Sequence, residues 1–247
     1  MCIRDSVIDA STAHRVNPEW TYGIPELDGK RESIRTAKRV ANPGCYPTSV
    51  ILFLEPLISG GILEQTAPIT IHALSGYSGG GRTLIERWED STGGLPTLPY
   101  EAPYALDRVH KHIPEMKYYT GLTEDPQFVP AVGAFHSGMR VQIPLPKSLL
   151  GTATAGDIWA ALNARYADEP FVRLAPLDAP SDRDETSFDP QRNNGTNCVD
   201  LHVLPNPSGH VLLVGILDNL GKGASGAAVQ NLNLMLGLDE GTGIPGK

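Results

Sequence analysis

Hydrophobic and polar positions repeat with two different periods along this chain, and each period predicts one type of element. In several short stretches apolar residues alternate with polar ones or form a brief apolar run, which predicts strands. Two of them flank the sequence Pro-Asn-Pro-Ser-Gly at residues 205–209, and such a turn between apolar runs indicates a β-hairpin. The predicted strands are residues 7–10, 69–74, 139–145, 171–174, 198–204 and 210–217.

Helices are predicted where apolar residues recur every three to four positions or follow a turn as a longer run. The apolar run of residues 49–57 follows a proline-rich turn and stops at Gly60, since glycine commonly ends a helix. Further helices are predicted within residues 26–40 and 84–90. Two amphipathic helices are predicted as well, with apolar faces formed by Ile158 and Leu162 in residues 156–166 and by Val229, Leu232 and Leu236 in the closing segment.

One cysteine lies where a tight turn meets a predicted helix. The segment Asn-Pro-Gly-Cys-Tyr-Pro-Thr at residues 42–48 holds Cys45 between turn-forming residues that fix the backbone on both sides. Unpaired backbone N–H groups and the helix dipole favour negative charge at such a position. We therefore predict a lowered pKa for the Cys45 thiol and a nucleophilic thiolate. A buried cysteine that packs as a small hydrophobic residue is the alternative.

Composition and charge narrow the class of protein. The 247 residues are 40% hydrophobic and 19% charged, which is typical of soluble globular proteins. The net charge of −8 argues against a nucleic-acid partner, and no apolar run is long enough to span a membrane. The irregular spacing of Cys2, Cys45 and Cys198 indicates neither a disulfide framework nor a metal site. We therefore expect a cytoplasmic protein without a metal.

A glycine-rich turn follows the strand predicted at residues 69–74. Its sequence, Ser-Gly-Tyr-Ser-Gly-Gly-Gly-Arg at residues 75–82, exposes backbone N–H groups that can bind an anion. The turn matches neither a Walker loop nor a GxGxxG fingerprint. Arg82 at its end is a candidate partner for phosphate or carboxylate, and a solvated surface arginine is the alternative.

Other polar segments carry candidate chemistry. His110 and His112 are candidate general bases, and Glu115 is placed to orient one of them or to hold a helix start. Exposed loop histidines are the alternative. We take the two histidine side chains to point in opposite directions and therefore predict no shared metal. Candidates for contact with a cofactor or an anion, with a structural role as the alternative, are Ser11, Thr12, Arg15 and Asn219.

Taken together, these segments resemble one protein family. Residues 42–48 look like the active-site motif of the N-acetyl-gamma-glutamyl-phosphate reductases, the arginine-biosynthesis members of the semialdehyde dehydrogenase superfamily. The spacing resembles the shorter subtype, although Ser137 and Ala227 stand where glutamine is usual. Several separated motifs in the expected order are more specific than any one of them. The other matching segments are residues 8–15, 75–82, 110–116, 135–145 and 218–231.

The resemblance implies an α/β fold in two parts. Residues 1–41 and 221–247 would be the remnant of a Rossmann-like NADP-binding domain. Residues 42–220 would be an α+β catalytic and dimerisation domain with a mixed, largely antiparallel sheet. Family members begin with a βαβ unit whose glycine-rich turn binds the cofactor pyrophosphate, and this sequence has no such unit. We therefore expect an N-terminally truncated chain with foreign residues at 1–6, weak or no activity, and assembly into a dimer or tetramer.

The resemblance also implies a reaction. Cys45 would displace phosphate from an acyl phosphate substrate and form a thioester. NADPH would then reduce this thioester to N-acetyl-glutamate 5-semialdehyde. His112, or His110 in its place, would move the proton, and Glu115 would orient that base. The implied contacts are Arg82 and Gly81 with the substrate, and Ser11, Ser78, Gly79 and Asn219 with NADP(H).

Two other functions stay open on these residues. A related acyl-phosphate reductase, such as aspartate-semialdehyde dehydrogenase or its aminoadipyl-phosphate counterpart, would apply the same chemistry to another substrate. A thiol hydrolase or acyltransferase with a Cys45/His112 pair would need no cofactor. It would leave the loop of residues 9–15 and the segment around Asn219 without a role.

Overall fold

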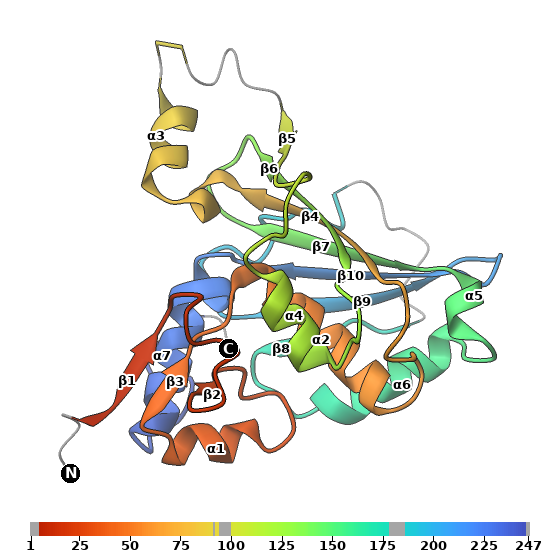
Figure 1. Ribbon diagram of the computed structural model, residues 1–247, viewed down its shortest axis with the longest axis horizontal. Coiled ribbons are helices and arrows are strands. Elements are labelled where there is room, and N and C mark those ends of the chain that lie inside the picture. The colour runs from red at the N-terminus through yellow and green to blue at the C-terminus, as the bar shows by residue number, and fades with distance from the viewer. Residues whose placement is uncertain (1–4, 91, 94–99, 178–185, 246–247) are drawn as a thin grey trace.

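Seven strands among the described residues form one mixed sheet, which carries or borders most of the candidate chemistry (Figure 1). The computed structural model describes residues 5–90, 92–93, 100–177 and 186–245. The strands are β4 (Thr70–Gly76), β5 (Glu101–Pro103), β6 (Gln127–Gly133), β7 (Met139–Leu145), β8 (Val172–Leu174), β9 (Val199–Pro205) and β10 (Val211–Leu217). They lie side by side in the order β5-β6-β4-β7-β10-β9-β8. Only β4 with β6 and β8 with β9 are parallel pairs, so the sheet is mixed and largely antiparallel, as expected.

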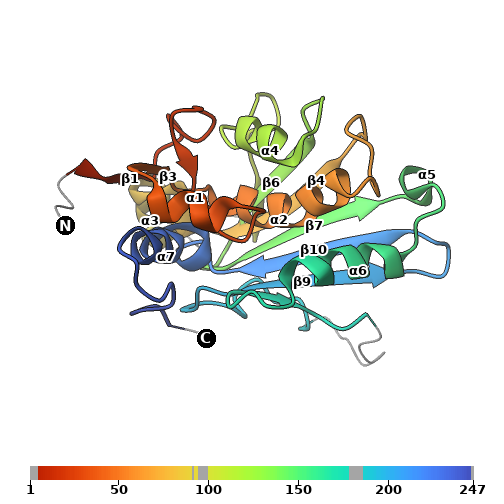
Figure 2. The ribbon, with the colours of Figure 1, turned by 90° about the horizontal axis from the view of Figure 1, so that it is seen from below.

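Helices cover one face of this sheet (Figure 2). Helix α2 (Cys45–Ser59) packs on β7 and β10, and both α4 (Ile113–Thr120) and α6 (Ala155–Tyr166) pack against α2. The short helix α5 (Lys147–Leu150) follows β7. Burial alternates strictly along β7, because side chains of a strand point to opposite faces. The side chains of β7 on the helix-covered face are fully buried, and they are Met139, Val141, Ile143 and Leu145.

A second, smaller sheet lies beside the start of α2 (Figure 1). Its strands β1 (Val7–Asp9), β2 (Thr21–Tyr22) and β3 (Arg39–Ala41) are parallel and lie in the order β1-β3-β2. Helices α1 (Lys30–Thr36) and α7 (Gly226–Met235) pack together next to it. The small core between these elements is formed by Ile34, Val40, Leu234 and Met235.

Most of the predicted elements are present, with small shifts of their bounds. All predicted strands and the hairpin of β9 and β10 are confirmed, and so are the helices at 45–59 and 155–166. Residues 39–40, predicted as helix, belong to β3 instead, because α1 ends at Thr36 and the chain then pairs with β1 and β2. Strand β6 was not predicted, because burial on nearly all its positions and the proline at its centre hide the alternation of a strand.

The apolar face predicted for the closing helix faces outward in the structure. Val229 is 39% exposed and Leu232 is 40% exposed, whereas the amide side chains of the same helix are buried. Gln230 donates a hydrogen bond to Glu26, and Asn231 donates one to the carbonyl of Gly23. Because these amides find buried partners, the polar side of α7 faces the protein, which the hydrophobic pattern alone cannot show.

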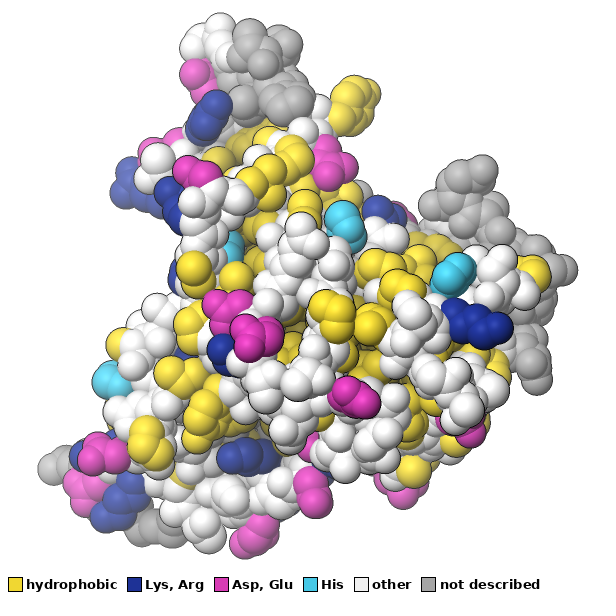
Figure 3. Space-filling model, turned by 45° about the vertical axis from the view of Figure 1, so that its right-hand side comes forward, with side chains coloured by type: hydrophobic (Ala, Val, Ile, Leu, Met, Phe, Trp, Pro, Cys, Tyr) yellow, Lys and Arg dark blue, Asp and Glu magenta, His cyan; other side chains and the backbone are white. Residues whose placement is uncertain are grey.

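The remaining elements lie at the ends of the large sheet. The 3₁₀ turn η2 (Tyr77–Gly80) and helix α3 (Arg82–Glu89) follow β4, and the π-helical turn η4 (Gly221–Ser225) precedes α7. No helix in the described residues is long and apolar enough to cross a membrane. Basic and acidic side chains are interspersed on the face seen in Figure 3. Residues 1–4 of the segment expected to be foreign lie outside the described residues.

Candidate active site

Cys45 is the first residue of α2, as the turn before it predicts. Gly44 precedes the helix in an extended conformation, with φ −78° and ψ 155°. Pro47 suits the first turn, because the N–H that proline lacks would have no partner inside the helix. The hydroxyl of Thr48 donates a hydrogen bond to the Gly44 carbonyl at 2.9 Å. The Thr48–Gly44 hydrogen bond therefore stabilises the first turn of α2, where Cys45 lies.

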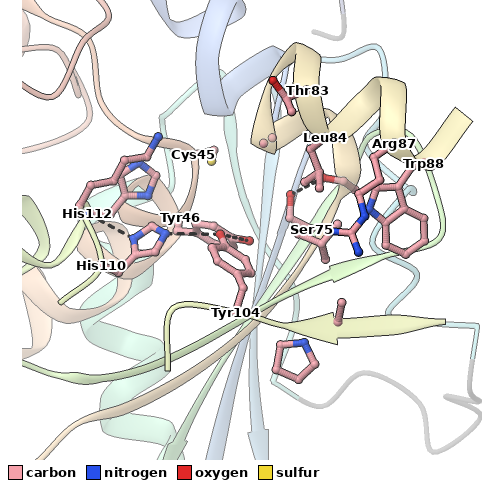
Figure 4. A pocket seen from close by; sticks show the side chains of 17 residues that line it. Cys45, Tyr46, Ser75, Thr83, Leu84, Arg87, Trp88, Tyr104, His110 and His112 are labelled. Carbon is pink, nitrogen blue, oxygen red and sulfur yellow. Dashed lines mark hydrogen bonds between the residues drawn. The ribbon is translucent and has the colours of Figure 1, made fainter. Parts of the chain in front are cut away.

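The Cys45 side chain lines a cavity of about 620 Å³ (Figure 4). This volume is in the range of ordinary small-molecule sites. One side of the cavity is formed by the end of β4 with η2 and α3, and another by residues 102–104 and 110–112. His110 and His112 both line it, so a ligand in the cavity can reach the thiol and an imidazole together.

Burial raises the pKa of the Cys45 thiol to about 11. Hydrogen bonds from the backbone N–H groups of Tyr46 and Cys45 lower the pKa, as a helix start should, but their effect is smaller. The prediction of a lowered pKa is therefore wrong for this structure, because desolvation disfavours the thiolate more than the helix start favours it. Cys45 is a thiol at neutral pH, and its attack on a carbonyl needs a base.

The two histidines are close together, not turned apart. Their ring centres are 4.9 Å apart, and the backbone N–H of His112 donates to Nδ1 of His110 at 3.2 Å. The expectation of opposite directions is wrong, because side chains two positions apart lie on the same side even of an extended chain. Here the chain also turns at His112 to enter α4. Burial lowers the pKa of His110 to about 4 and that of His112 to about 2, so both imidazoles are neutral. No group of three or more His, Cys, Asp or Glu side chains in the described residues is placed to hold a metal ion.

The two imidazoles differ in their hydrogen bonds. Nε2 of His110 lies 3.4 Å from the hydroxyl of Tyr104, so both of its ring nitrogens have partners. Nδ1 of His112 has no hydrogen-bond partner among the described residues, although it is buried. No hydrogen bond joins Cys45 to either ring in the described part of the chain. The shared cavity, and not a direct bond, brings thiol and imidazole together.

Glu115 holds the backbone in front of Cys45 and makes no hydrogen bond to a histidine in the described residues. Its Oε2 accepts from the Gly44 N–H at 3.1 Å and from the Tyr22 hydroxyl at 2.7 Å. Its Oε1 forms an ion pair with Arg15 at 2.6 Å. Burial raises the pKa of Glu115, while Arg15 and these hydrogen bonds lower it. Arg15, predicted to contact a cofactor or anion, is itself buried on this carboxylate.

A hydrogen bond joins Asn219 to Ser78, which belongs to the glycine-rich turn. Nδ2 of Asn219 donates to the Ser78 hydroxyl at 3.0 Å, and Oδ1 of Asn219 accepts from the Gly138 N–H at 2.8 Å. Both polar ends of the Asn219 side chain are thus engaged within the protein. Gly79 follows Ser78 and lines the cavity, and a side-chain carbon added there would lie 3.2 Å from Oγ of Ser75 and 3.5 Å from Nδ2 of Asn219.

The structure separates Arg82 from the cavity and brings Arg87 to it. Arg82 is 90% exposed and pairs with Glu86 one turn along α3, at 2.6 Å. Arg87 lines the cavity, and no ion pair engages it within the described residues. Gly81 turns the chain into α3 with a φ of +74°, which favours glycine. Helical periodicity was a usable signal for Arg87, since residues 83, 84, 87 and 88 share one face of α3.

The loop after β1 lies apart from this cavity. The hydroxyl of Ser11 donates to Asp9 at 2.6 Å, and both side chains are at the surface. Neither Ser11 nor Thr12 lines the Cys45 cavity. Sequence reasoning also missed Tyr104, Lys111 and Trp88, whose places on the cavity depend on contacts between distant segments.

Comparison with known proteins first defines the class. Residues 45–219 match the family model described as the semialdehyde dehydrogenase dimerisation domain. Aspartate semialdehyde dehydrogenase II from Vibrio cholerae superposes with a TM-score of 0.64 at 18% identity, over 93% of this chain and 72% of that one. A probable aspartate-semialdehyde dehydrogenase from Pseudomonas aeruginosa superposes with a TM-score of 0.65 at 18% identity, over 94% and 72%. The fold is that of the semialdehyde dehydrogenases, as the motifs implied.

Curated relatives then define the family. N-acetyl-gamma-glutamyl-phosphate reductase of Burkholderia cenocepacia is 49% identical over 235 residues, which are 94% of this chain and 74% of that protein. N-acetyl-gamma-glutamyl-phosphate reductase 2 of Nostoc sp. is 49% identical over 96% of this chain and 76% of its own length. The corresponding Pseudomonas putida protein is 47% identical over 94% and 74%. The chain belongs to the N-acetyl-gamma-glutamyl-phosphate reductase family.

Proposed function

We propose that the protein reduces N-acetyl-glutamyl 5-phosphate with NADPH to N-acetyl-glutamate 5-semialdehyde, phosphate and NADP⁺, a step of arginine biosynthesis. The observation that carries this proposal is one cavity lined by a thiol at a helix start and by two neutral imidazoles. The names of relatives that are 47% and 49% identical support the choice of substrate. The same site would serve an aspartyl phosphate, so substrate choice needs a test of its own.

His112 is the proposed base. Nε2 of His112 lies beside Gly44, the residue before Cys45: a side-chain carbon added there would be 2.9 Å from this nitrogen. Because the raised pKa of Cys45 and the lowered pKa of His112 disfavour a separate thiolate–imidazolium pair, the neutral imidazole takes the thiol proton as the sulfur attacks the acyl carbon. A C–S bond forms as the C–O bond to phosphate breaks. NADPH, when bound, supplies the hydride that reduces the thioester. The C–S bond then breaks, the sulfur keeps its electron pair, and His112 returns the proton to it.

His110 supports the assignment of His112 as the base through its hydrogen bonds. Because its two ring nitrogens face the His112 backbone and the Tyr104 hydroxyl, it is held in place and has less freedom to move a proton. Glu115 acts on the other side, through the Gly44 N–H. We therefore assign proton transfer to His112 and positioning to His110 and Glu115.

Arg87, and not Arg82, is the proposed contact for a negatively charged group of the substrate. Arg87 lines the cavity of Cys45 together with Lys111, and both side chains are exposed enough to meet a ligand. Arg82 is paired with Glu86 on the outer side of α3. Gly81 contributes the turn that begins α3, while Gly79 and Gly80 present their backbone to the cavity.

The residues at the ends of the parallel strands fit a nucleotide cofactor. Ligands of parallel α/β sheets bind at the carboxyl ends of the strands. β1 leads into Ser11, and its neighbour β3 leads directly into the turn before Cys45, with Asp9 opposite Ala41. Ser11 after β1 and Gly79 after β4 are the residues that would hold NADP(H), and the Ser78–Asn219 hydrogen bond would fix the turn that contains Gly79.

The presence of two separate sheets supports the proposed division of the chain. The small sheet with α7 would be the NADP-binding part, residues 1–41 and 221–247, and the large sheet the catalytic part, residues 42–220. The face of the large sheet opposite α2 has partly exposed side chains such as Gln142 and Leu212. Together with the dimerisation-domain match, this face supports a homo-oligomer built on that sheet.

A coupled assay tests the function. The protein expressed from its complete gene is given the semialdehyde, phosphate and NADP⁺, and the formation of NADPH is followed by absorbance. We expect activity that Cys45→Ser lowers by at least about 10³-fold, because the thioester cannot form. Cys198→Ser is the matched control, since that cysteine lies outside the cavity.

Mass spectrometry distinguishes the alternatives. With acyl phosphate and no cofactor, an acyl group bound to Cys45 is the expected intermediate. Hydrolysis of the acyl phosphate without any oxidation of NADPH would show a thiol hydrolase and overturn the proposal. A higher kcat/KM with β-aspartyl phosphate than with N-acetyl-glutamyl phosphate would assign the protein to the aspartate branch of the superfamily.

A further inference from the structure

Arg15 joins three segments that meet next to Cys45. Its Nε donates to the carbonyl of Asn42 at 3.0 Å, and its Nη2 donates to the carbonyl of Ala10 at 3.0 Å. Its Nη1 forms the 2.6 Å ion pair with Glu115 on α4. The side chain is only 8% exposed, so this guanidinium is directed at the protein and away from solvent.

Glu115 passes this restraint on to the residue before the thiol. Its second oxygen, Oε2, accepts the Gly44 N–H and the Tyr22 hydroxyl. A side-chain carbon at Gly44 would lie 2.7 Å from Nη1 of Arg15, 2.8 Å from Oε1 of Glu115 and 2.9 Å from Nε2 of His112. Three side chains from distant parts of the chain therefore converge on the one residue that precedes Cys45.

The same arginine is also held at its backbone. The hydroxyl of Tyr119 donates to the Arg15 carbonyl at 2.6 Å, and the ring of Tyr119 stacks on that of Tyr22 with centres 3.7 Å apart. The loop after β1, the small sheet and α4 are thus locked to one another around this residue. Such an arrangement can transmit a defined position to the thiol.

We propose that Arg15 is a positioning residue of the reaction, which through Glu115 and Asn42 fixes the Gly44 backbone and so places the Cys45 thiol against His112. The inference rests on the assignment of Cys45 as the nucleophile in the proposed function. Only arginine presents donors in a planar fork to several acceptors at once, and lysine would supply a point charge without this geometry. A buried carboxylate that loses its charged partner destabilises the folded protein, so we expect Glu115 to move from its present position when Arg15 is replaced.

The first test compares Arg15→Lys with the unchanged protein. We expect the rate of Cys45 alkylation by iodoacetamide and kcat each to fall about tenfold, the value of one charge-assisted hydrogen bond. KM for the acyl phosphate should change by less than about twofold, since Arg15 does not line the cavity. Arg39→Lys is the matched control, because Arg39 pairs with Glu19 at the surface of the neighbouring strand and should leave both rates unchanged.

Two results with Arg15→Lys would overturn the inference. Unchanged alkylation and kcat with a raised KM for NADPH would show that Arg15 binds an anion of the cofactor. Unchanged kinetics with a lower melting temperature would show a role in stability alone. If Arg15→Lys does not fold, Tyr22→Phe removes one hydrogen bond from the same carboxylate, and alkylation should fall about threefold. Unchanged alkylation in a folded Tyr22→Phe protein would equally contradict positioning through Glu115.

The alkylation readout separates this inference from the proposed function. It needs neither substrate nor cofactor, and when alkylation is measured on the Cys45 peptide it reports the state of that thiol apart from Cys2 and Cys198. Slower alkylation in a protein that never oxidises NADPH would support the positioning role and overturn the reductase. If the unchanged protein reduces the acyl phosphate and Arg15→Lys is alkylated at the unchanged rate, the reductase is supported and the positioning role is overturned.

Discussion

The two walls of the Cys45 cavity are built on opposite principles. The α4 wall is buried, and its charged groups already have partners inside the protein. Its buried lining residues are His110 and His112, and Glu115 and Arg15 lie behind them. The α3 wall carries the exposed side chain of Arg87 and presents glycine backbone to the cavity. It consists of Gly79, Gly80, Arg87 and Trp88.

This difference separates chemistry from recognition. Groups that move protons work best when their positions are fixed before the substrate arrives, because no rearrangement is then needed during the reaction. Groups that bind a charged substrate must keep donors free for it. Arg15 and Arg87 show this contrast in one residue type. The guanidinium of Arg15 forms an ion pair within the protein, whereas that of Arg87 lines the cavity and can contact a ligand.

Among the variants of the two walls, removal of the proposed base, His112, should lower kcat the most. Because the pKa of Cys45 is raised to about 11, a thiol at neutral pH depends on an imidazole to lose its proton. We expect His112→Gln to lower kcat by about 10²–10⁴-fold with little change in KM. Steady-state kinetics at pH 7.5 and at pH 9.5 measure it, and the loss should shrink at the higher pH, where more thiolate forms unaided.

His110→Gln is the matched variant for this prediction. Its ring nitrogens hold the His112 backbone and face Tyr104, so glutamine should preserve part of their hydrogen bonding and cost less activity. A larger loss in His110→Gln than in His112→Gln would exchange the roles of the two histidines. A loss in His112→Gln that stays constant up to pH 9.5 would argue against thiol deprotonation as its task.

The start of α2 could be foreseen from sequence, whereas the bonded wall beside it could not. A turn with two prolines and a glycine predicts where a helix begins, and α2 begins at Cys45 as expected. The ion pair of Arg15 and Glu115 joins residues that are 100 positions apart. Nothing local to either residue indicates the other, and the same burial that creates the pair raises the pKa of Cys45 against the local prediction.

The α7 and α3 helices show a second limit. In α7 the apolar stripe is outward and the amides are inward, because hydrogen-bond partners from Gly23 and Glu26 decide the orientation. In α3 the choice between Arg82 and Arg87 depends on which side of the helix faces the cavity. Periodicity groups residues onto faces, but tertiary contacts decide which face meets the site.

Adding one carbon at Gly44 should break the α4 wall without touching the α3 wall. The new methyl group would lie within 2.9 Å of Arg15, Glu115 and His112, all buried side chains with little room to move. We expect Gly44→Ala to lower the free energy of unfolding by about 1–3 kcal/mol, as overpacking does. Chemical denaturation measures this change, and kcat should fall in parallel.

Gly156→Ala is the control for an added methyl group. Its nearest contact would be at 3.4 Å, an ordinary van der Waals distance, and it lies in the first turn of α6 far from the cavity. Alanine there should leave stability equal or slightly higher, because it favours a helix over glycine. Equal stability of Gly44→Ala and the unchanged protein would mean that the α4 wall yields more easily than its contacts suggest.

The α3 wall offers the smallest effect and the sharpest pair of variants. Arg87 and Arg82 lie on one helix, but only Arg87 faces the cavity. An exposed ionic contact contributes about 1 kcal/mol, so we expect Arg87→Gln to raise KM for the acyl phosphate about fivefold at unchanged kcat. Arg82→Gln loses only a surface pair with Glu86 and should leave KM within about twofold.

Added salt should weaken substrate binding in the unchanged protein and have less effect in Arg87→Gln. A raised KM in Arg82→Gln alone would return the substrate contact to the outer face of α3, and the two walls would then not divide chemistry from recognition.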